Sequence, residues 1–168
     1  RNAPYYNNAQ SKVGSANIVI ASGTVNGDIY AGGRVISSEK DTNRNEASSI
    51  VETSHVTLLK DGVFKGKNID AAGVVGDAIL TLGAEEIDLS NVTVKGFNKL
   101  EAAGHVDNLT FDFGEKNEAT FAGVFDIAEL KAQTPSKLTI ADSGIVALTK
   151  APAADITFHA ANGVLALG

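Results

Sequence analysis

One short pattern recurs along this chain of 168 residues and restricts its fold more than any other feature. The clearest copy occupies residues 17–33 (NIVIASGTVNGDIYAGG), where two apolar runs are separated by small residues and end in Gly-Gly. Apolar-Thr-apolar triplets then return, centred on Thr57, Thr81, Thr110, Thr139 and Thr157. A repeated strand-turn-strand unit cannot bury its apolar side alone, whereas stacked copies form a continuous core. The pattern therefore predicts a β-solenoid.

The spacing of the triplets predicts the length of one coil. The five threonines lie on average about 25 residues apart, a period typical of solenoid repeats. Val19 takes the place of Thr in a first triplet, but it lies farther than one such period before Thr57. The polar stretch 37–49 (SSEKDTNRNEASS) lies between them, and its length accounts for the excess. We therefore expect coils of this mean length, with a polar loop insertion at 37–49.

A second motif, apolar-x-Ala-(Ala/Gly)-Gly, supports the repeat and occurs at 29–33, 69–73 and 100–104. Side chains alternate across a strand, so coils that stack in register should align the triplet threonines in one outward ladder. Their apolar neighbours should fill the core. We expect one elongated all-β domain at 15–168, preceded by an N-terminal arm or linker at 1–14.

Composition excludes several classes of function. The chain has no cysteine, which excludes disulfides, thiolate zinc sites and a cysteine nucleophile. Its net charge of −6 argues against nucleic acid or anionic lipid as the main partner, since both are bound through clustered Lys and Arg. No segment has the length and hydropathy of a membrane span, and no signal-peptide pattern is present. Because the chain begins with Arg and ends on an apolar stretch, we expect a fragment of a longer protein.

Few polar residues fall in patterns that catalysis or metal binding requires. His55, His105 and His159 are spaced by about two coils and could share one face, but histidines without adjacent carboxylate pairs are typical of surface strands. The tripeptide Asp112-Phe113-Gly114 resembles a kinase metal-binding motif, yet the other kinase motifs are missing and a strand end with a turn explains it.

The carboxylates also show no pattern that catalysis or metal binding requires. The only adjacent pair is Glu85 and Glu86, and the aspartates are expected to be mostly single residues at turns. These are Asp28, Asp70, Asp77, Asp88, Asp107, Asp112, Asp126, Asp142 and Asp155. We predict no catalytic residue, no cofactor-binding residue and no metal ligand, and we assign no binding residue. The loop at 37–49 is the best candidate for a contact surface, because loops on a rigid scaffold often carry binding.

Residues 22–33 (SGTVNGDIYAGG) resemble the repeats of autotransporter passenger domains and related bacterial surface adhesins. The resemblance implies a right-handed parallel β-helix exported to the bacterial outer-membrane surface or the extracellular space. It transfers no functional residue, because the binding residues of these proteins are not held in a shared motif.

We therefore expect a non-enzymatic adhesin fragment. Its expected partner is a host or bacterial surface protein, a glycan or a second copy of the chain, and we expect no nucleic acid and no membrane insertion. Two alternatives remain open: a polysaccharide-cleaving enzyme domain on the same fold, which would need carboxylates gathered from neighbouring coils, and a structural stalk spacer.

Overall fold

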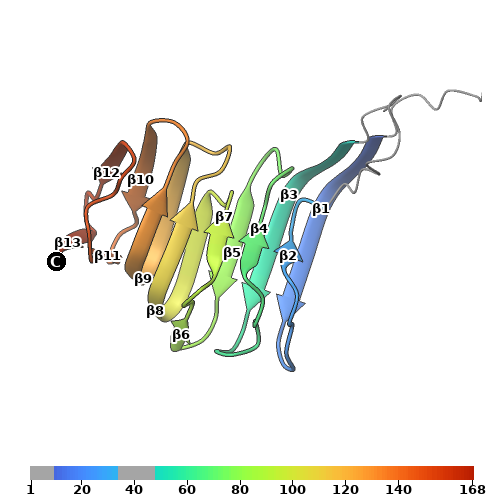
Figure 1. Cartoon of the computed structure of the whole chain (residues 1–168), viewed down its shortest axis with the longest axis horizontal. Coiled ribbons are helices and arrows are strands. Elements are labelled where there is room, and N and C mark those ends of the chain that lie inside the picture. Colours follow the sequence, from blue (N-terminus) through green and yellow to red (C-terminus); the bar gives the residue numbers. More distant parts are fainter. Residues whose placement is uncertain (1–9, 34–47) are drawn as a thin grey trace, which may run out of the picture.

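Residues 10–33 and 48–168 are described by a computed structural model, in which they form an elongated stack of β-coils (Figure 1). The paired strands of this part of the chain are all parallel. No helix occurs in the same residues, and hence none that could cross a membrane. The predicted all-β class and the single elongated β-solenoid are confirmed.

Strand β8 (Lys99–Asp112) shows how one coil is built, because it pairs with three strands of the preceding coil in turn. Its first residues pair with β5 (Ala78–Leu82), its middle with β6 (Glu86–Asp88) and its end with β7 (Thr93–Lys95). Its register against β9 (Glu118–Lys131) shifts after Glu101 and after Val106, where the chain turns two corners. A complete coil therefore has three faces.

The remaining strands pair side by side on these three faces. The first face contains β1 (Gln10–Ile20), β3 (Ser48–Leu58), β5, the starts of β8 and β9, β10 (Ser136–Ile140) and β12 (Ile156–His159). The second face contains β6, the middles of β8 and β9, β11 (Ile145–Leu148) and β13 (Val164–Leu167). The third face contains β2 (Ile29–Tyr30), β4 (Asn68–Asp70), β7 and the ends of β8 and β9.

Inside the solenoid, apolar side chains of successive coils stack in columns. On the third face one column consists of register partners that are at most 6% exposed, namely Ile29, Ile69, Val94, Phe111 and Leu130. Removing this apolar surface from water is the main favourable term in folding. A slip of one residue would turn the column outward, so burial fixes the register of the coils.

Four fully buried phenylalanines fill the interior where β8 and β9 stack. The ring centroids of Phe111 and Phe113 are 5.0 Å apart, and those of Phe111 and Phe121 are 4.9 Å apart, both edge to face. Phe125 lies 4.9 Å from Phe121 in a tilted arrangement. Such aromatic pairs stabilise a core beyond the area that they bury, so these rings strengthen the packing of β8 on β9.

The predicted threonine ladder is correct only at its start. Val19 pairs with Thr57, and Thr57 pairs with Thr81, as expected. Thr81, however, pairs with Glu101 on the next coil.

The other threonines lie elsewhere. Thr110 lies on the third face between Thr93 and Glu129. Thr139 lies on the first face beside Thr120, and Thr157 pairs with Lys137. The prediction fails because a coil extends over more than one face, and the apolar-Thr-apolar triplets lie on the first face in some coils and on the third in another.

The predicted coil length is also wrong beyond residue 82, where the coils are shorter. On the first face Leu100 pairs with Phe121, and Phe121 pairs with Ile140, so both of these coils fall short of the mean spacing of the triplets. The apolar-x-Ala-(Ala/Gly)-Gly motif marks equivalent positions of neighbouring coils in two of its three copies, since Ile29 pairs with Ile69 and Tyr30 with Asp70. The third copy, at 100–104, belongs to the first face.

The boundaries predicted for the N-terminal part of the chain fall only partly on described residues. Strand β1 begins at Gln10, so it includes the end of the segment 1–14 that was expected to be an arm. The first nine residues lie outside the described part of the chain. Most of the predicted insertion at 37–49 also lies outside it, and its last two residues begin β3.

Candidate functional site

Several of the aspartates connect neighbouring coils. In four cases the carboxylate accepts a hydrogen bond from the side-chain amide of an asparagine on the next coil: Asp28 from Asn68 at 3.1 Å, Asp77 from Asn98 at 2.8 Å, Asp88 from Asn108 at 3.0 Å and Asp142 from Asn162 at 3.3 Å. We call these contacts the Asp–Asn rungs. Four of the aspartates singled out from the sequence therefore have a structural role, because they join neighbouring coils.

Hydrogen bonding lowers the pKa of three rung carboxylates below the ordinary value of 3.8. For Asp28 the largest cause is the Asn68 side chain, followed by the backbone N–H groups of Lys67 and Asn68. The pKa of Asp77 is lowered chiefly by Asn98 and then by Lys99. Donors that favour the ionised form have this effect on any carboxylate. The rungs therefore stabilise the ionised side chains.

Two further aspartates close local turns. Asp70 accepts from the backbone N–H of Ala72, and Asp112 accepts from that of Gly114, both at 2.8 Å. The second contact confirms that Asp112-Phe113-Gly114 is a strand end with a turn. The expectation that the aspartates lie mostly at turns holds for seven of the nine, which lie outside strands or at the last residue of one, whereas Asp107 and Asp126 lie within strands.

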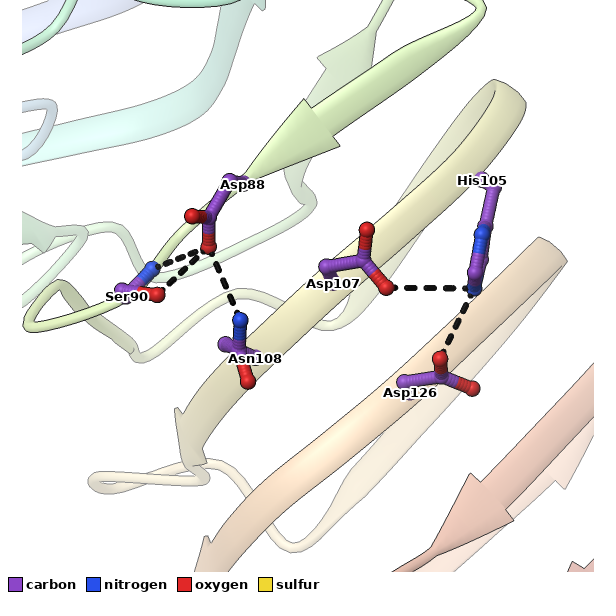
Figure 2. Close-up of polar contacts among 6 residues, drawn as sticks. All are labelled: Asp88, Ser90, His105, Asp107, Asn108 and Asp126. Atoms are coloured by element: carbon purple, nitrogen blue, oxygen red, sulfur yellow. Dashed lines mark hydrogen bonds and ion pairs between the residues drawn. The ribbon is translucent and has the colours of Figure 1, made fainter.

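His105, Asp107 and Asp126 form a cluster on the second face that differs from the rungs (Figure 2). The Nε2 atom of His105 lies 2.9 Å from Oδ2 of Asp126 and 3.5 Å from Oδ1 of Asp107. Figure 2 shows the imidazole reaching toward both carboxylates, with the Asp88 rung nearby. The three side chains are partly open to solvent, at 37% for His105, 41% for Asp107 and 42% for Asp126. We call these three residues the His105 cluster.

Strand alternation brings the cluster together. His105 and Asp107 flank Val106, and Asp126 lies between Phe125 and Ile127 on the next coil. Because these apolar neighbours are buried, at most 2% exposed, the polar side chains point outward. The corner before His105 is also fixed, since a Cβ atom at Gly104 would overlap the carbonyl oxygen of Glu85. Only glycine allows this close approach of two coils.

Additional negative charge lies on the preceding coil. Glu86 is the register partner of His105, and Asp88 is the register partner of Asp107. Like charges directly opposite on neighbouring strands are unfavourable. The second face thus places two carboxylates beside the imidazole and two more acidic residues on the preceding coil, an arrangement suited to attracting a cation.

Farther along the second face, the outward side chains become apolar. The column that begins with Glu86 and His105 continues through Val124, Ile145 and Val164. Ile145 is 39% exposed and Val164 is 54% exposed. We call these five residues the outer column. A row of polar and then apolar side chains on a rigid sheet can contact a partner along its length.

The predicted alignment of the three histidines is correct for two of them. His55 and His159 lie in one column of the first face, through Ile79, Lys99, Thr120 and Thr139. His105 lies on the second face, so the alignment of all three is wrong. Its carboxylate neighbours were not predicted from the sequence. The pattern His-x-Asp with an aspartate one coil later would have indicated them, but only with the correct coil length.

Three surface hollows in the described part of the chain lie away from the His105 cluster. One surrounds Lys116, whose ammonium donates to the carbonyl oxygens of Val74 at 2.9 Å and Gly76 at 2.8 Å. Two others lie around Pro152 and around His55. The cluster itself lies on a partly exposed strand surface. Comparisons with protein families, with curated proteins and with solved structures find no significant match to this chain.

Proposed function

We propose that this chain is a non-enzymatic binding segment of a bacterial surface or secreted protein, similar to an autotransporter passenger domain. The β-solenoid fold and the resemblance of residues 22–33 to passenger repeats both support the proposal. In this proposal the segment lies outside the cell or at the outer-membrane surface. Its partner is a host or bacterial surface protein, a glycan or a second copy of the chain.

The outer column is the observation that carries this proposal. A stalk spacer needs no exposed apolar side chains on a flat strand face, whereas contact surfaces combine apolar and polar groups. Ile145 and Val164 supply the apolar part, and Glu86 and His105 supply the polar part. The stacked backbone holds these groups in place, so little ordering is needed when a partner binds.

An enzyme that cleaves polysaccharides is the second candidate, and one observation favours it. Asp107 and Asp126 lie on neighbouring coils beside His105, and enzymes of this class require carboxylates gathered from neighbouring coils. The rung aspartates offer less support, because their carboxylates already connect coils.

A binding panel with matched variants tests the proposal. The labelled chain is titrated against extracellular-matrix proteins, mucin-type and bacterial glycans, and intact host and bacterial cells. We expect saturable binding to at least one probe, weakened about tenfold or more by Ile145→Glu, because a buried charge at a contact centre is costly. Val19→Glu is the control, since Val19 is 55% exposed on a different face.

The same panel separates the alternatives. Turnover of a polysaccharide that is abolished by Asp107→Asn or Asp126→Asn would overturn the proposal in favour of the enzyme. The absence of both binding and turnover would favour the spacer. Equal loss of binding in the Ile145→Glu and Val19→Glu variants would show that the second face is not the specific contact surface.

A further inference from the structure

We propose that the His105 cluster binds one divalent first-row transition-metal ion such as Zn²⁺. Each residue offers one ligand atom, and these three atoms lie within 4.8 Å of one another. Metal–ligand bonds of about 2.0–2.2 Å place adjacent ligand atoms about 3.0–3.5 Å apart. The separations of 2.9 Å and 3.5 Å from His105 Nε2 to the two carboxylates match this spacing.

The ligand types indicate which ions fit. Calcium and magnesium prefer shells made of oxygen atoms, whereas imidazole nitrogen suits zinc, copper, nickel and cobalt. One imidazole and two carboxylates therefore favour a transition metal over an alkaline-earth ion. Three protein ligands on an open face leave at least one coordination position for water or for a group of a partner.

The contacts of Asp107 and Asp126 distinguish them from the structural aspartates. The rung aspartates accept hydrogen bonds that join two coils, and Asp70 and Asp112 close turns. Within the described residues, the side-chain contacts found for Asp107 and Asp126 are those with His105. Their carboxylates therefore have lone pairs left for a metal ion.

The surrounding charge also favours a cation. Glu86 and Asp88 stand one strand away, as register partners of His105 and Asp107. Their negative potential raises the local concentration of cations. A bound divalent ion would also offset the repulsion between carboxylates on neighbouring coils.

The backbone holds the ligands in place before an ion binds. Val106 and Phe125, beside the ligands, are fully buried. The backbone N–H of His105 donates to the carbonyl oxygen of Glu85 at 2.7 Å. A metal ion would connect β8 to β9, so binding should raise the melting temperature of the whole chain.

Calorimetric titration of the tag-free, EDTA-treated chain with zinc chloride tests the inference. We expect one ion per chain, a higher melting temperature with zinc, and binding of calcium that is weaker by about tenfold or more. His105→Gln, Asp107→Asn and Asp126→Asn should each weaken zinc binding about tenfold or more, since even changes to groups that only orient the ligands reach this size. Circular dichroism of the metal-free variants checks that each is folded.

Two control variants make the test specific. His55→Gln removes a histidine that contacts Thr81 on the first face, and Asp142→Asn removes an exposed carboxylate from a rung. Both should bind zinc within about twofold of the original chain. If a cluster variant does not fold, NMR spectra of the original chain replace it. Selective broadening of the amide signals of residues 105, 107 and 126 by cobalt would support metal binding at the His105 cluster, and its absence would contradict it.

Three results would overturn the inference. They are the absence of saturable zinc binding, equal binding by the cluster variants, and equal weakening in the cluster and control variants. The experiment uses no partner or polysaccharide, so its failure is distinguishable from failure of the proposed function.

Discussion

Asp88 illustrates how single residues connect the coils of this protein. Its Oδ1 atom accepts from the backbone N–H of Ser90 at 2.9 Å, from the Ser90 hydroxyl at 2.6 Å and from Asn108 at 3.0 Å. The carboxylate thus completes its own turn and reaches the next coil. The pKa of Asp88 is lowered, chiefly by the Ser90 side chain and then by Asn108.

The lowered pKa of Asp88 predicts a stability that depends on pH. The ionised carboxylate is favoured more in the folded than in the unfolded chain, so its contribution is present above the unfolded value of 3.8 and is lost as pH falls through the folded value. Asp88→Asn should therefore unfold more easily than the original chain at pH 7, and this difference should shrink below pH 3.8. Urea unfolding at a series of pH values measures it.

Asp155→Asn is the matched control for the Asp88 experiment. It removes the same charge from an exposed position, where no side-chain hydrogen bond to the carboxylate is found among the described residues. It should lower the free energy of unfolding at pH 7 less than Asp88→Asn does. A difference between Asp88→Asn and the original chain that stays constant from pH 7 to pH 3 would contradict the role assigned to the carboxylate.

At the scale of elements, the corners of the long strands determine how closely coils approach. Gly104 lies at the first corner of β8, and Gly123 lies at the corresponding corner of β9 with a φ of 125°. Strands and glycine-rich turns were predictable from the sequence, because alternation and turn residues are local signals. The path of β8 and β9 through all three faces was not, since their corners lie inside continuous paired strands.

Gly104→Ala tests the contact at this corner. Its Cβ atom would meet the backbone of Glu85, which cannot move without displacing a coil. We expect a loss of about 1–3 kcal/mol in the free energy of unfolding, as for other overpacked positions. Denaturant titration measures the change.

Gly27→Ala is the control for the corner, because no atom lies within 4 Å of a Cβ built there. It should change the free energy of unfolding by at most about 0.5 kcal/mol. Equal effects of the two substitutions would show that the coils are not packed as closely as the structure has them.

At the scale of the whole molecule, the fold class followed from repetition, whereas the candidate site did not. A repeated unit with one apolar side needs neighbours, and this requirement holds whatever the coil length. The His105 cluster depends on the coil length itself, because Asp126 is 21 residues after His105. A mean period taken from triplets on different faces was too long and placed these two residues apart. In three of the four Asp–Asn rungs the aspartate and the asparagine are 20 or 21 residues apart, as with Asp88 and Asn108. This separation is the length of one of the shorter coils, which the spacing of the threonines did not reveal.

Disulfide formation between introduced cysteines tests the register of the coils most directly, because the chain has no cysteine of its own. Register partners on parallel strands lie about 4.8 Å apart, within the range of about 4.4–6.8 Å between Cα atoms that a disulfide spans. Thr57→Cys with Thr81→Cys joins such partners. Thr81→Cys with Thr110→Cys joins residues that the predicted threonine ladder would align but that the structure places on different faces. Mass spectrometry after mild oxidation should find the first disulfide and not the second, and the opposite result would contradict the stacked arrangement on which the His105 cluster and the outer column depend.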